Sequence, residues 1–363
     1  MYGLGLVIFK IIGRTRARVR LPFLAAQRDV GVIGCGQYSF AIIGYFVWRK
    51  HGARFRKCYD IKRDAAFTFA NFYSAEVAST AEEIFEDPAI SHVIIASNHA
   101  SHASYAVAAL LHEKTVYVEK PVAVSLPQLA CLKAAVARNP QRIVFGFNRP
   151  FSKAISLVKS NFPEKSQPLT LSCFITGHVI GPDHWYRLPQ EGTRICGNIA
   201  HWLDLAVHIL SWRDLPDRWS IALSWASENA RDDNLAISLT SARGDLVSIV
   251  MTSRDEPFEG INENINLQVG ALIAKIDDFR EVKIWSGEHY AHHRIWPKDV
   301  GHRNTILQLF DEPRRAWDEI EASALLTLHI KNMVESAIKN SEFSFSTAKI
   351  LLNDHAPSSL LAH

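Results

Sequence analysis

The fold is constrained most by a short apolar run, Val30-Gly31-Val32-Ile33, which leads directly into Gly34-Cys35-Gly36 and a helical stretch ending near Trp48. Continuous β-branched residues are typical of a strand buried on both faces of a parallel sheet. The pairing of strand and helix then repeats, with strands expected at residues 55–59, 92–96, 115–118 and 142–146. Regular alternation of this kind implies right-handed β-α-β crossovers. The sequence therefore predicts an α/β fold with a doubly wound parallel sheet.

A change of pattern near residue 149 predicts a second domain, which a chain of 363 residues is long enough to form. Its apolar segments are longer and partly alternating, which favours strands with one face in solvent. They lie at residues 169–178, 219–225, 235–240, 246–252, 264–276 and 282–285, with helices around residues 199–210 and 315–339. We therefore expect an N-terminal extension (1–27), a first domain (28–148), a second α+β domain with a large, mostly antiparallel open sheet (149–345) and a C-terminal tail (346–363).

The composition indicates a globular protein, because 48% of the residues are hydrophobic and 21% are charged. The 40 Lys and Arg against 37 Asp and Glu give a net charge of +3, too small and diffuse for a nucleic-acid-binding surface. The five cysteines are scattered and form no C-x-x-C pair, which argues against a disulfide framework and a zinc site. We therefore expect a cytoplasmic protein without a bound metal.

The N-terminal segment is apolar from Leu4 to Ile12 and is followed by Arg14, Arg16, Arg18 and Arg20. It is too short to span a bilayer, and Lys10 interrupts it. A secretory signal has the reverse order, with its positive charges before the apolar stretch. An extra strand, an extra helix or a poorly ordered arm is expected, and a basic segment lying on a membrane surface is the alternative.

The turn Gly34-x-Gly36-x-x-Ser39 joins a strand to a helix and has the residue types that bind a dinucleotide. Glycines let the backbone approach a pyrophosphate, whose charge then lies at the helix N-terminus. Asp60 ends the second strand, where a carboxylate accepts hydrogen bonds from an adenosine ribose, and this favours NAD(H). Lys62 and Arg63 follow it and leave NADP(H) open, because cations there bind a 2′-phosphate. The structural alternative is that Asp60 caps the next helix.

Two further clusters carry candidate catalytic residues. Lys120 of Glu119-Lys120-Pro121 follows a predicted strand, so its ammonium faces the ligand crevice of a parallel sheet and is placed to hold a substrate hydroxyl. His201 lies on a predicted helix, and an imidazole that titrates near neutrality suits a general base. Asp204 and His208 share its helical stripe, and Asp204 is placed to support His201 electrostatically. The alternatives are a surface Glu-Lys turn and, for His208, a core or interface histidine.

In their order along the chain, these motifs resemble the Gfo/Idh/MocA family of oxidoreductases from about Asp29 to Lys339. The resemblance also rests on Ile95-Ala96-Ser97-Asn98-His99-Ala100-Ser101-His102 and on Gly146-Phe147-Asn148-Arg149. It implies an N-terminal Rossmann domain that binds NAD(P) and a C-terminal domain whose open sheet forms homodimers or homotetramers. The activity it implies is oxidation of a sugar or polyol hydroxyl, or the reverse reduction.

The resemblance also implies roles for single residues. Lys120 would hold the reacting hydroxyl and His201 would remove its proton, while Asp204 matches the family aspartate three residues after that histidine. The candidate cofactor-binding residues are Gly34, Gly36, Gln37, Tyr38, Asp60, Ser97, Asn98, His102 and Glu119. The candidate substrate-binding residues are Lys120, Asn148, Arg149, Trp185, Tyr186, Arg187 and Asn198. Residues 178–194 resemble the variable loop that faces substrate, and an aromatic residue plus an arginine suits a sugar ring with an anionic group, such as a nucleotide sugar.

The chain departs from the family pattern at two places. Many members have an aspartate four residues before the catalytic histidine, and this chain has Gly197 there, which puts a two-residue acid/base relay in question. Asn98-His99 stands where Pro-Asn is common.

The sequence thus predicts an NAD(P)-dependent dehydrogenase or reductase acting on a sugar, amino sugar, nucleotide sugar or cyclitol. Two rivals stay open. One is a non-catalytic NAD(P)-binding sensor or regulator on the same scaffold, since a fold does not dictate a function. The other is a reductase of a non-sugar carbonyl or imine. The presence of both Lys120 and His201 favours the enzyme.

Overall fold

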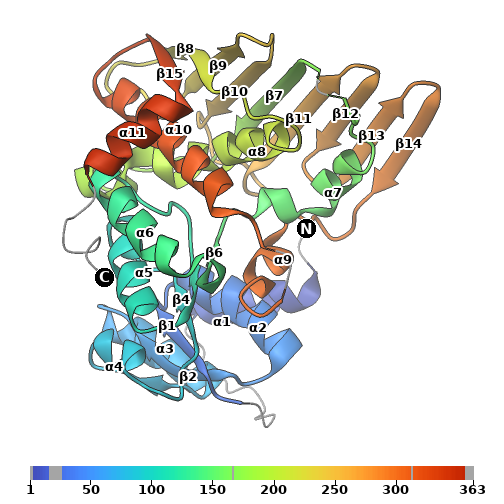
Figure 1. Cartoon of the computed structure of the whole chain (residues 1–363). Coiled ribbons are helices and arrows are strands. Elements are labelled where there is room, and N and C mark those ends of the chain that lie inside the picture. The colour runs from blue at the N-terminus through green and yellow to red at the C-terminus, as the bar shows by residue number, and fades with distance from the viewer. Residues whose placement is uncertain (1–2, 16–26, 166, 312–313, 356–363) are drawn as a thin grey trace.

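The computed structural model describes residues 3–15, 27–165, 167–311 and 314–355, which form two sheets (Figure 1). The first sheet has six strands in the order β3-β2-β1-β4-β5-β6. They are β1 (Val30–Ile33), β2 (Phe55–Tyr59), β3 (Glu76–Val77), β4 (His92–Ile95), β5 (Thr115–Val118) and β6 (Ile143–Phe145). All neighbouring pairs are parallel. This confirms the predicted doubly wound sheet, whose strand order reverses between β1 and β4, the position at which such sheets bind ligands.

Helices cover both faces of this sheet, so strands such as β1 are buried along their whole length. They are η1 (Ser39–Ile43), α2 (Gly44–His51), α3 (Arg63–Tyr73), α4 (Glu82–Phe85), η2 (His99–Ser101), α5 (His102–Leu111), α6 (Leu126–Arg138) and η3 (Pro140–Arg142). Helix α6 shows how local sequence sets a boundary, since the Ser125 side chain accepts a hydrogen bond from the Gln128 backbone N–H. The helix η1 begins directly after the glycine turn, with π-helical hydrogen bonding.

The second sheet has nine strands in the order β14-β13-β12-β11-β7-β10-β9-β8-β15. They are β7 (Leu169–Thr176), β8 (Arg218–Trp225), β9 (Leu235–Ser241), β10 (Leu246–Thr252), β11 (Asn262–Val269), β12 (Leu272–Asp277), β13 (Glu281–Ser286), β14 (His289–Arg294) and β15 (Asn340–Ser344). Strands β7 and β10 pair in parallel, and the other neighbours are antiparallel. The mostly antiparallel sheet that the sequence predicts is therefore confirmed.

Three details of the second domain were predicted wrongly. The single strand expected at residues 264–276 is a hairpin of β11 and β12, which turns at Gly270 with φ +54°. Strand β14 was not expected, because its sequence His-Tyr-Ala-His-His-Arg has no apolar alternation and suits a sheet edge. The long terminal helix ends earlier than predicted, so that β15 follows it at the opposite edge.

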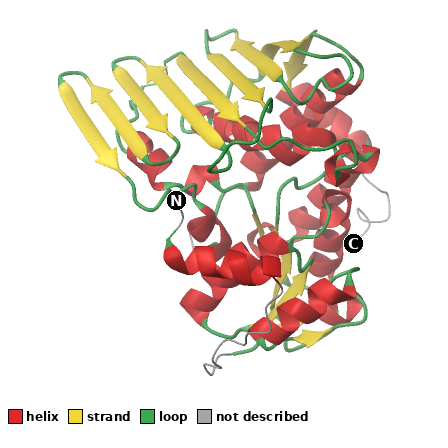
Figure 2. Cartoon of the chain, turned by 180° about the vertical axis from the view of Figure 1, so that it is seen from behind, coloured by secondary structure: helices red, strands yellow, loops and turns green. Residues whose placement is uncertain are grey.

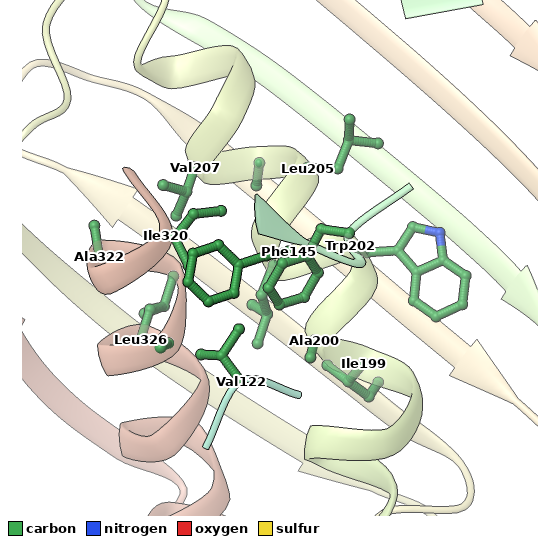
Figure 3. Close-up of a cluster of buried hydrophobic side chains, with 14 of the residues drawn as sticks. Val122, Phe145, Ile199, Ala200, Trp202, Leu205, Val207, Ile320, Ala322 and Leu326 are labelled. Carbon is green, nitrogen blue, oxygen red and sulfur yellow. The ribbon is translucent and has the colours of Figure 1, made fainter. Parts of the chain in front are cut away.

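Helices lie on one side only of the nine-stranded sheet (Figure 2). They are η4 (Arg149–Phe151), α7 (Lys153–Lys159), η5 (Trp185–Arg187), η6 (Pro189–Glu191), η7 (Ile195–Ile199), α8 (Ala200–Leu210), α9 (His302–Leu307) and α10 (Trp317–Glu335). Figure 3 shows Phe145, the last residue of β6, between α8 and α10 in the core of the second domain. One continuous hydrophobic cluster thus joins the two sheets and fixes how their edges face each other.

The two ends of the chain form helices. Helix α1 (Leu4–Thr15) is one of the three forms expected for the N-terminal extension, whereas Arg16, Arg18 and Arg20 lie outside the described residues. Helix α11 (Phe345–Asp354) occupies the first part of the segment expected to be a tail. Among the described helices, none combines the length and apolarity needed to cross a bilayer.

Candidate functional site

The glycine turn leaves open space at the carboxyl end of β1. Gly34 has φ +88°, and a Cβ there would lie 2.4 Å from the carbonyl oxygen of Ala96, so only glycine fits. Gly36 is exposed, and a Cβ on it would meet no atom within 4 Å. Gly36 and Gln37, just before η1, are exposed, so the backbone of this turn is open to a ligand, as a bound pyrophosphate requires. This cradle fits a dinucleotide.

Asp60 lies directly beside the glycine turn. Its carboxylate accepts hydrogen bonds from the backbone N–H groups of Cys35 and Lys62, each at 2.7 Å. The alternative that Asp60 caps the next helix does not hold, because α3 starts after Lys62 with no side-chain cap. A carboxylate oxygen accepts more than one hydrogen bond, so Asp60 retains capacity for ribose hydroxyls.

Tyr38 connects the glycine turn to Glu119 and to the second domain. Its hydroxyl lies 3.1 Å from Nδ1 of His302, the first residue of α9. The Tyr117 hydroxyl donates to Glu119, and a Cβ on Gly146 would lie 2.6 Å from the Glu119 carboxylate, so a glycine is required there. Burial raises the pKa of Glu119, while hydrogen bonds from Tyr117 and Tyr38 oppose that rise. Glu119 is therefore a buried positioning residue beside Lys120.

The segment after β4 is tied to the second domain. Nδ2 of Asn98 donates to the buried carboxylate of Glu191 at 2.7 Å, and Nδ1 of His99 lies 2.9 Å from the Glu191 carbonyl oxygen. The Ser97 hydroxyl bonds to Ser101 at 2.7 Å. Ser97 and Asn98 are two of the residues predicted to bind the cofactor. In the structure Asn98 joins the two domains and Ser97 stabilises the turn, and the cofactor contacts of both residues stay predictions.

His102 has two carbonyl partners rather than an exposed nitrogen. Its ring nitrogens lie 2.8 Å from the Pro121 oxygen and 3.1 Å from the Ser97 oxygen, and the side chain is buried. Burial lowers its pKa to about 4, although both hydrogen bonds act in the opposite direction. His102 therefore joins the turn after β4 to the Lys120-Pro121 turn, and its contact with the cofactor stays a prediction.

Lys120 and the helix that carries His201 meet in the structure. Nζ of Lys120 donates to the carbonyl oxygen of Gly197 at 2.8 Å, across the boundary between the domains. Gly197 lies in η7, which continues directly into α8, so His201 is about one helical turn further on. The Lys120 charge is among the causes that lower the pKa of His201, which places the two groups in one electrostatic neighbourhood.

Two polar atoms at this meeting point have no partner. Nδ1 of His201 and Oδ1 of Asn198 are both buried without a hydrogen bond. Burial, followed by the charges of Arg149 and Lys120, holds the pKa of His201 well below its usual range, so the imidazole is neutral at pH 7. A buried polar atom without a partner costs free energy, and a hydroxylated ligand would supply the missing hydrogen bonds.

An aromatic loop covers Lys120 and Gly197. The Tyr186 ring centroid lies 6.0 Å from Nζ of Lys120, 4.7 Å from the His99 ring and 4.4 Å from the Trp185 ring. Trp185 remains 39% exposed. The two aromatic side chains predicted to contact substrate therefore form one wall beside the candidate catalytic lysine.

Arg187 anchors this loop and does not point to the same wall. Its guanidinium donates to Asp233 at 2.9 Å and to the carbonyl oxygens of Ile180 and Gly181 at 3.0 Å. The buried Arg194 pairs with the same Asp233 at 3.1 Å. Arg187 and Arg194 thus share one carboxylate, and the contact of Arg187 with an anionic substrate group stays a prediction.

Asp204 pairs with Arg315 of the segment before α10. Both of its oxygens accept hydrogen bonds from Arg315, at 2.9 and 3.0 Å, and its side chain is fully buried. Arg315 also contacts Glu319, which lies 2.7 Å from Nδ1 of His208. The helical stripe of 204 and 208 thus faces α10, and the catalytic role of Asp204 stays a prediction. The expectation that His208 is an interface histidine agrees with this contact.

Asn148 and Arg149 also have structural partners. Nδ2 of Asn148 donates to the Val300 carbonyl oxygen at 2.6 Å. Arg149 pairs with the buried Glu263 at 2.7 Å and its guanidinium carbon lies 4.3 Å from the Trp202 ring centroid. Both residues lie at the domain junction, from which the Arg149 charge lowers the pKa of His201, and their substrate contacts stay predictions.

The first domain decides the classification. Residues 28–147 match a family model described as an oxidoreductase family with an NAD-binding Rossmann fold, GFO_IDH_MocA. The first domain thus matches the Gfo/Idh/MocA family of oxidoreductases.

A curated relative and two solved structures are similar to this chain. Inositol 2-dehydrogenase of Burkholderia lata is 27% identical over 158 residues, which are 42% of this chain and 47% of that protein. The chain thus matches about half the length of this curated relative. An oxidoreductase domain protein from Kribbella flavida superposes with a TM-score of 0.71 at 16% identity, covering 88% of this chain and 100% of that one. Levoglucosan dehydrogenase in complex with NADH and L-sorbose gives 0.70 at 15% identity, covering 87% and 98%.

Sequence reasoning missed two residues of this candidate site. His302 lies beside Tyr38, and burial with the charges of Arg149, Lys10 and Lys120 lowers its pKa to about 3. Glu191 joins the aromatic loop to Asn98. Each is a single polar residue without a motif, and the only local signal was Gly301, whose φ of +91° brings α9 against Asn148. No group of three or more potential metal ligands gathers in the part of the chain that the structure describes.

Gly197 and Tyr186 form a matched pair, which gives a first testable prediction. A Cβ on Gly197 would lie 2.5 Å from Cε2 of Tyr186, so in Gly197→Ala the Tyr186 ring must shift. We expect this overpacking to lower the free energy of unfolding by about 1–3 kcal/mol. Thermal and urea unfolding measure the change.

A double-mutant cycle tests the cause. In the Tyr186→Ala background, Gly197→Ala should no longer destabilise the protein. Gly181→Ala in the same loop is the matched control, because a Cβ there meets no atom within 4 Å. Equal destabilisation by Gly197→Ala with and without the Tyr186 ring would show that the two residues are not coupled.

Proposed function

We propose that this protein is an NAD(P)-dependent oxidoreductase that transfers hydride between a nicotinamide and the carbinol or carbonyl carbon of a sugar, nucleotide sugar or cyclitol. The observation that carries the proposal is the 2.8 Å contact of Lys120 with Gly197, which places an ammonium from the first domain beside the helix of His201. The names of the relatives, inositol 2-dehydrogenase and levoglucosan dehydrogenase, support the substrate class.

The bound nicotinamide would supply the hydride acceptor or donor, and the chain supplies orientation and charge. The glycine turn and Asp60 hold the dinucleotide. Lys120 moves from the Gly197 carbonyl oxygen to the substrate oxygen and stabilises negative charge there. His201, neutral because it is buried, accepts the hydroxyl proton during oxidation and returns it during reduction.

The substrate is a polyhydroxylated ring. Oδ1 of Asn198 and Nδ1 of His201 lack partners, and hydroxyl groups satisfy such atoms. Trp185 and Tyr186 offer aromatic faces to the apolar side of the ring. The test is thermal unfolding with NAD(H) plus a panel of cyclitols, sugars and nucleotide sugars, followed by nicotinamide absorbance with each stabilising compound. Stabilisation with turnover supports the proposal, whereas NAD(H) binding without turnover of any compound favours the non-catalytic sensor.

The preferred cofactor is NAD(H), which Asp60→Ala tests. Removing the carboxylate is expected to raise the Kd of NADH by about tenfold and to improve relative use of NADPH, because the ribose loses a charged hydrogen-bond acceptor. Nucleotide fluorescence titrations measure both constants. Asp60→Asn is the control that keeps an acceptor for the Cys35 N–H. An unchanged ratio of the two affinities in Asp60→Ala contradicts the ribose contact.

The open sheet is the proposed homodimer or homotetramer surface. Its helix-free face carries exposed apolar side chains, among them Phe174, Leu246 and Ile273. Exposed apolar residues clustered on one face favour association. We also place the protein in the cytoplasm, because its five cysteines form no disulfide framework in the sequence.

A further inference from the structure

Helix α1 precedes the residues that match the family model, yet it is built into the first domain. Its Leu6 and Phe9 side chains are buried, and the Phe9 ring centroid lies 4.9 Å from that of Tyr45 and 5.3 Å from that of Phe72. All of these residues belong to the hydrophobic cluster that also contains Val30 of β1. The helix therefore has a defined place in the fold.

The second half of α1 touches the glycine turn. Nε2 of Gln37 donates to the carbonyl oxygen of Lys10 at 3.0 Å. A Cβ on Gly13 would lie 2.8 Å from Oε1 of Gln37 and 2.7 Å from the Phe40 ring, so the helix approaches the turn too closely for any larger residue. Gln37 directly follows the exposed Gly36. The contact is thus next to the place expected for the cofactor pyrophosphate.

Two cations of α1 lie near this contact. Lys10 is half-buried, and its burial together with the Arg14 charge lowers its pKa. The Lys10 charge is in turn one of the causes that lower the pKa of His302, which lies beside the Tyr38 hydroxyl. Positive charge from α1 therefore acts between the glycine turn and α9. The helix contains no acidic residue, and Figure 1 shows it beside α2, below α9.

We propose that α1 is an outer wall of the dinucleotide site, and that Lys10 and Arg14 contribute positive charge to the pyrophosphate of the bound cofactor. The inference rests on the proposed function, because only a protein that binds a dinucleotide has a pyrophosphate at this turn. A lysine ammonium is a compact charge suited to phosphate oxygens. The contribution is electrostatic and must weaken as salt concentration rises.

The test is binding of NADH to the full chain, measured by nucleotide fluorescence. The variants are Lys10→Met, which keeps the length of the side chain, Arg14→Gln, and the two together. Lys349→Ala on α11 is the matched control, because it removes one charge at the far end of the fold. We expect the double variant to raise the Kd of NADH by about tenfold at low salt, and the control to leave it unchanged.

Salt and ligand separate a charge effect from a structural one. In about 1 M NaCl, where the Debye length is near 3 Å, the double variant and the wild type should bind NADH within about twofold of each other. Adenosine, which has no phosphate, should bind both equally. If Lys10→Met fails to fold, Lys10→Arg and the exposed Arg14→Gln carry the comparison, with Lys10→Arg expected to retain affinity.

The outcomes separate the inference from the function on which it rests. Equal NADH affinity of the folded charge variants and the wild type at low salt overturns the role of α1 and leaves the proposed function standing. A loss of NADH affinity that persists in 1 M NaCl or extends to adenosine also overturns it, since the cause is then a distorted turn. A wild type that binds neither NADH nor NADPH overturns the proposed function itself.

Discussion

Lys120→Ala is expected to lower kcat/KM for the matched sugar or cyclitol by about 10³-fold, a typical loss when a group that stabilises oxyanion charge is removed. The Lys120 ammonium lies at the end of β5 and reaches the helix of His201, so no other described side chain takes its place there. Cofactor affinity should change little, because the glycine turn and Asp60 are untouched. Nicotinamide absorbance under steady-state conditions measures the first effect, and NADH titration measures the second.

A charge-conserving variant makes the assignment sharper. Lys120→Arg keeps the cation, but its charge is spread over a planar guanidinium and not held on a compact ammonium, so it should rescue only a small part of the activity. Folding must be compared too, because Lys120→Ala leaves the Gly197 carbonyl oxygen without its donor. A Lys120→Ala protein that is folded, binds NADH and turns over substrate at the wild-type rate would remove Lys120 from the mechanism.

The first domain was predictable because its information is local. Strands such as Val30–Ile33 are buried on both faces and therefore appear as continuous apolar runs, and the glycines mark the turn that follows. The second domain was predicted less exactly, because the local pattern is ambiguous or missing at two of its strands. Val269 and Leu272 flank the Gly270 turn, so the hairpin reads as one apolar strand, and the polar edge strand His289–Arg294 has no hydrophobic pattern.

The candidate site was predictable to the extent that motifs carry it. Lys120 was chosen because it follows a predicted strand, and His201 because it lies on a predicted helix. The structure brings the two segments together. The partners of charged residues were not predictable, because they come from distant parts of the chain. Arg315 is separated from Asp204 by 111 residues, and Glu191 from Asn98 by 93. From the sequence alone, Asp204 is the expected partner of His201, because the two residues share a helical stripe. The pairing of Asp204 with Arg315 is visible only in the structure.

Asp204→Ala is therefore expected to destabilise the protein rather than to impair its chemistry. Arg315 is left as a buried charge without its bidentate partner, and breaking such a pair costs about 3–5 kcal/mol. Burial raises the pKa of Asp204 and the Arg315 charge opposes this rise, so the contact with Arg315 stabilises the ionised carboxylate. Urea unfolding measures the loss. Glu319 still contacts Arg315, which keeps the cost toward the lower end of that range.

A second substitution distinguishes a structural pair from a catalytic one. Asp204→Leu combined with Arg315→Met removes both charges, and we expect it to be more stable than Asp204→Ala, because apolar residues of similar volume often replace a buried pair at little cost. Below its unfolding transition, the double variant should bind NADH and turn over substrate at rates close to wild type. If its folded form loses activity as Lys120→Ala does, then Asp204 acts on His201 after all, through a path that the Arg315 contact does not reveal.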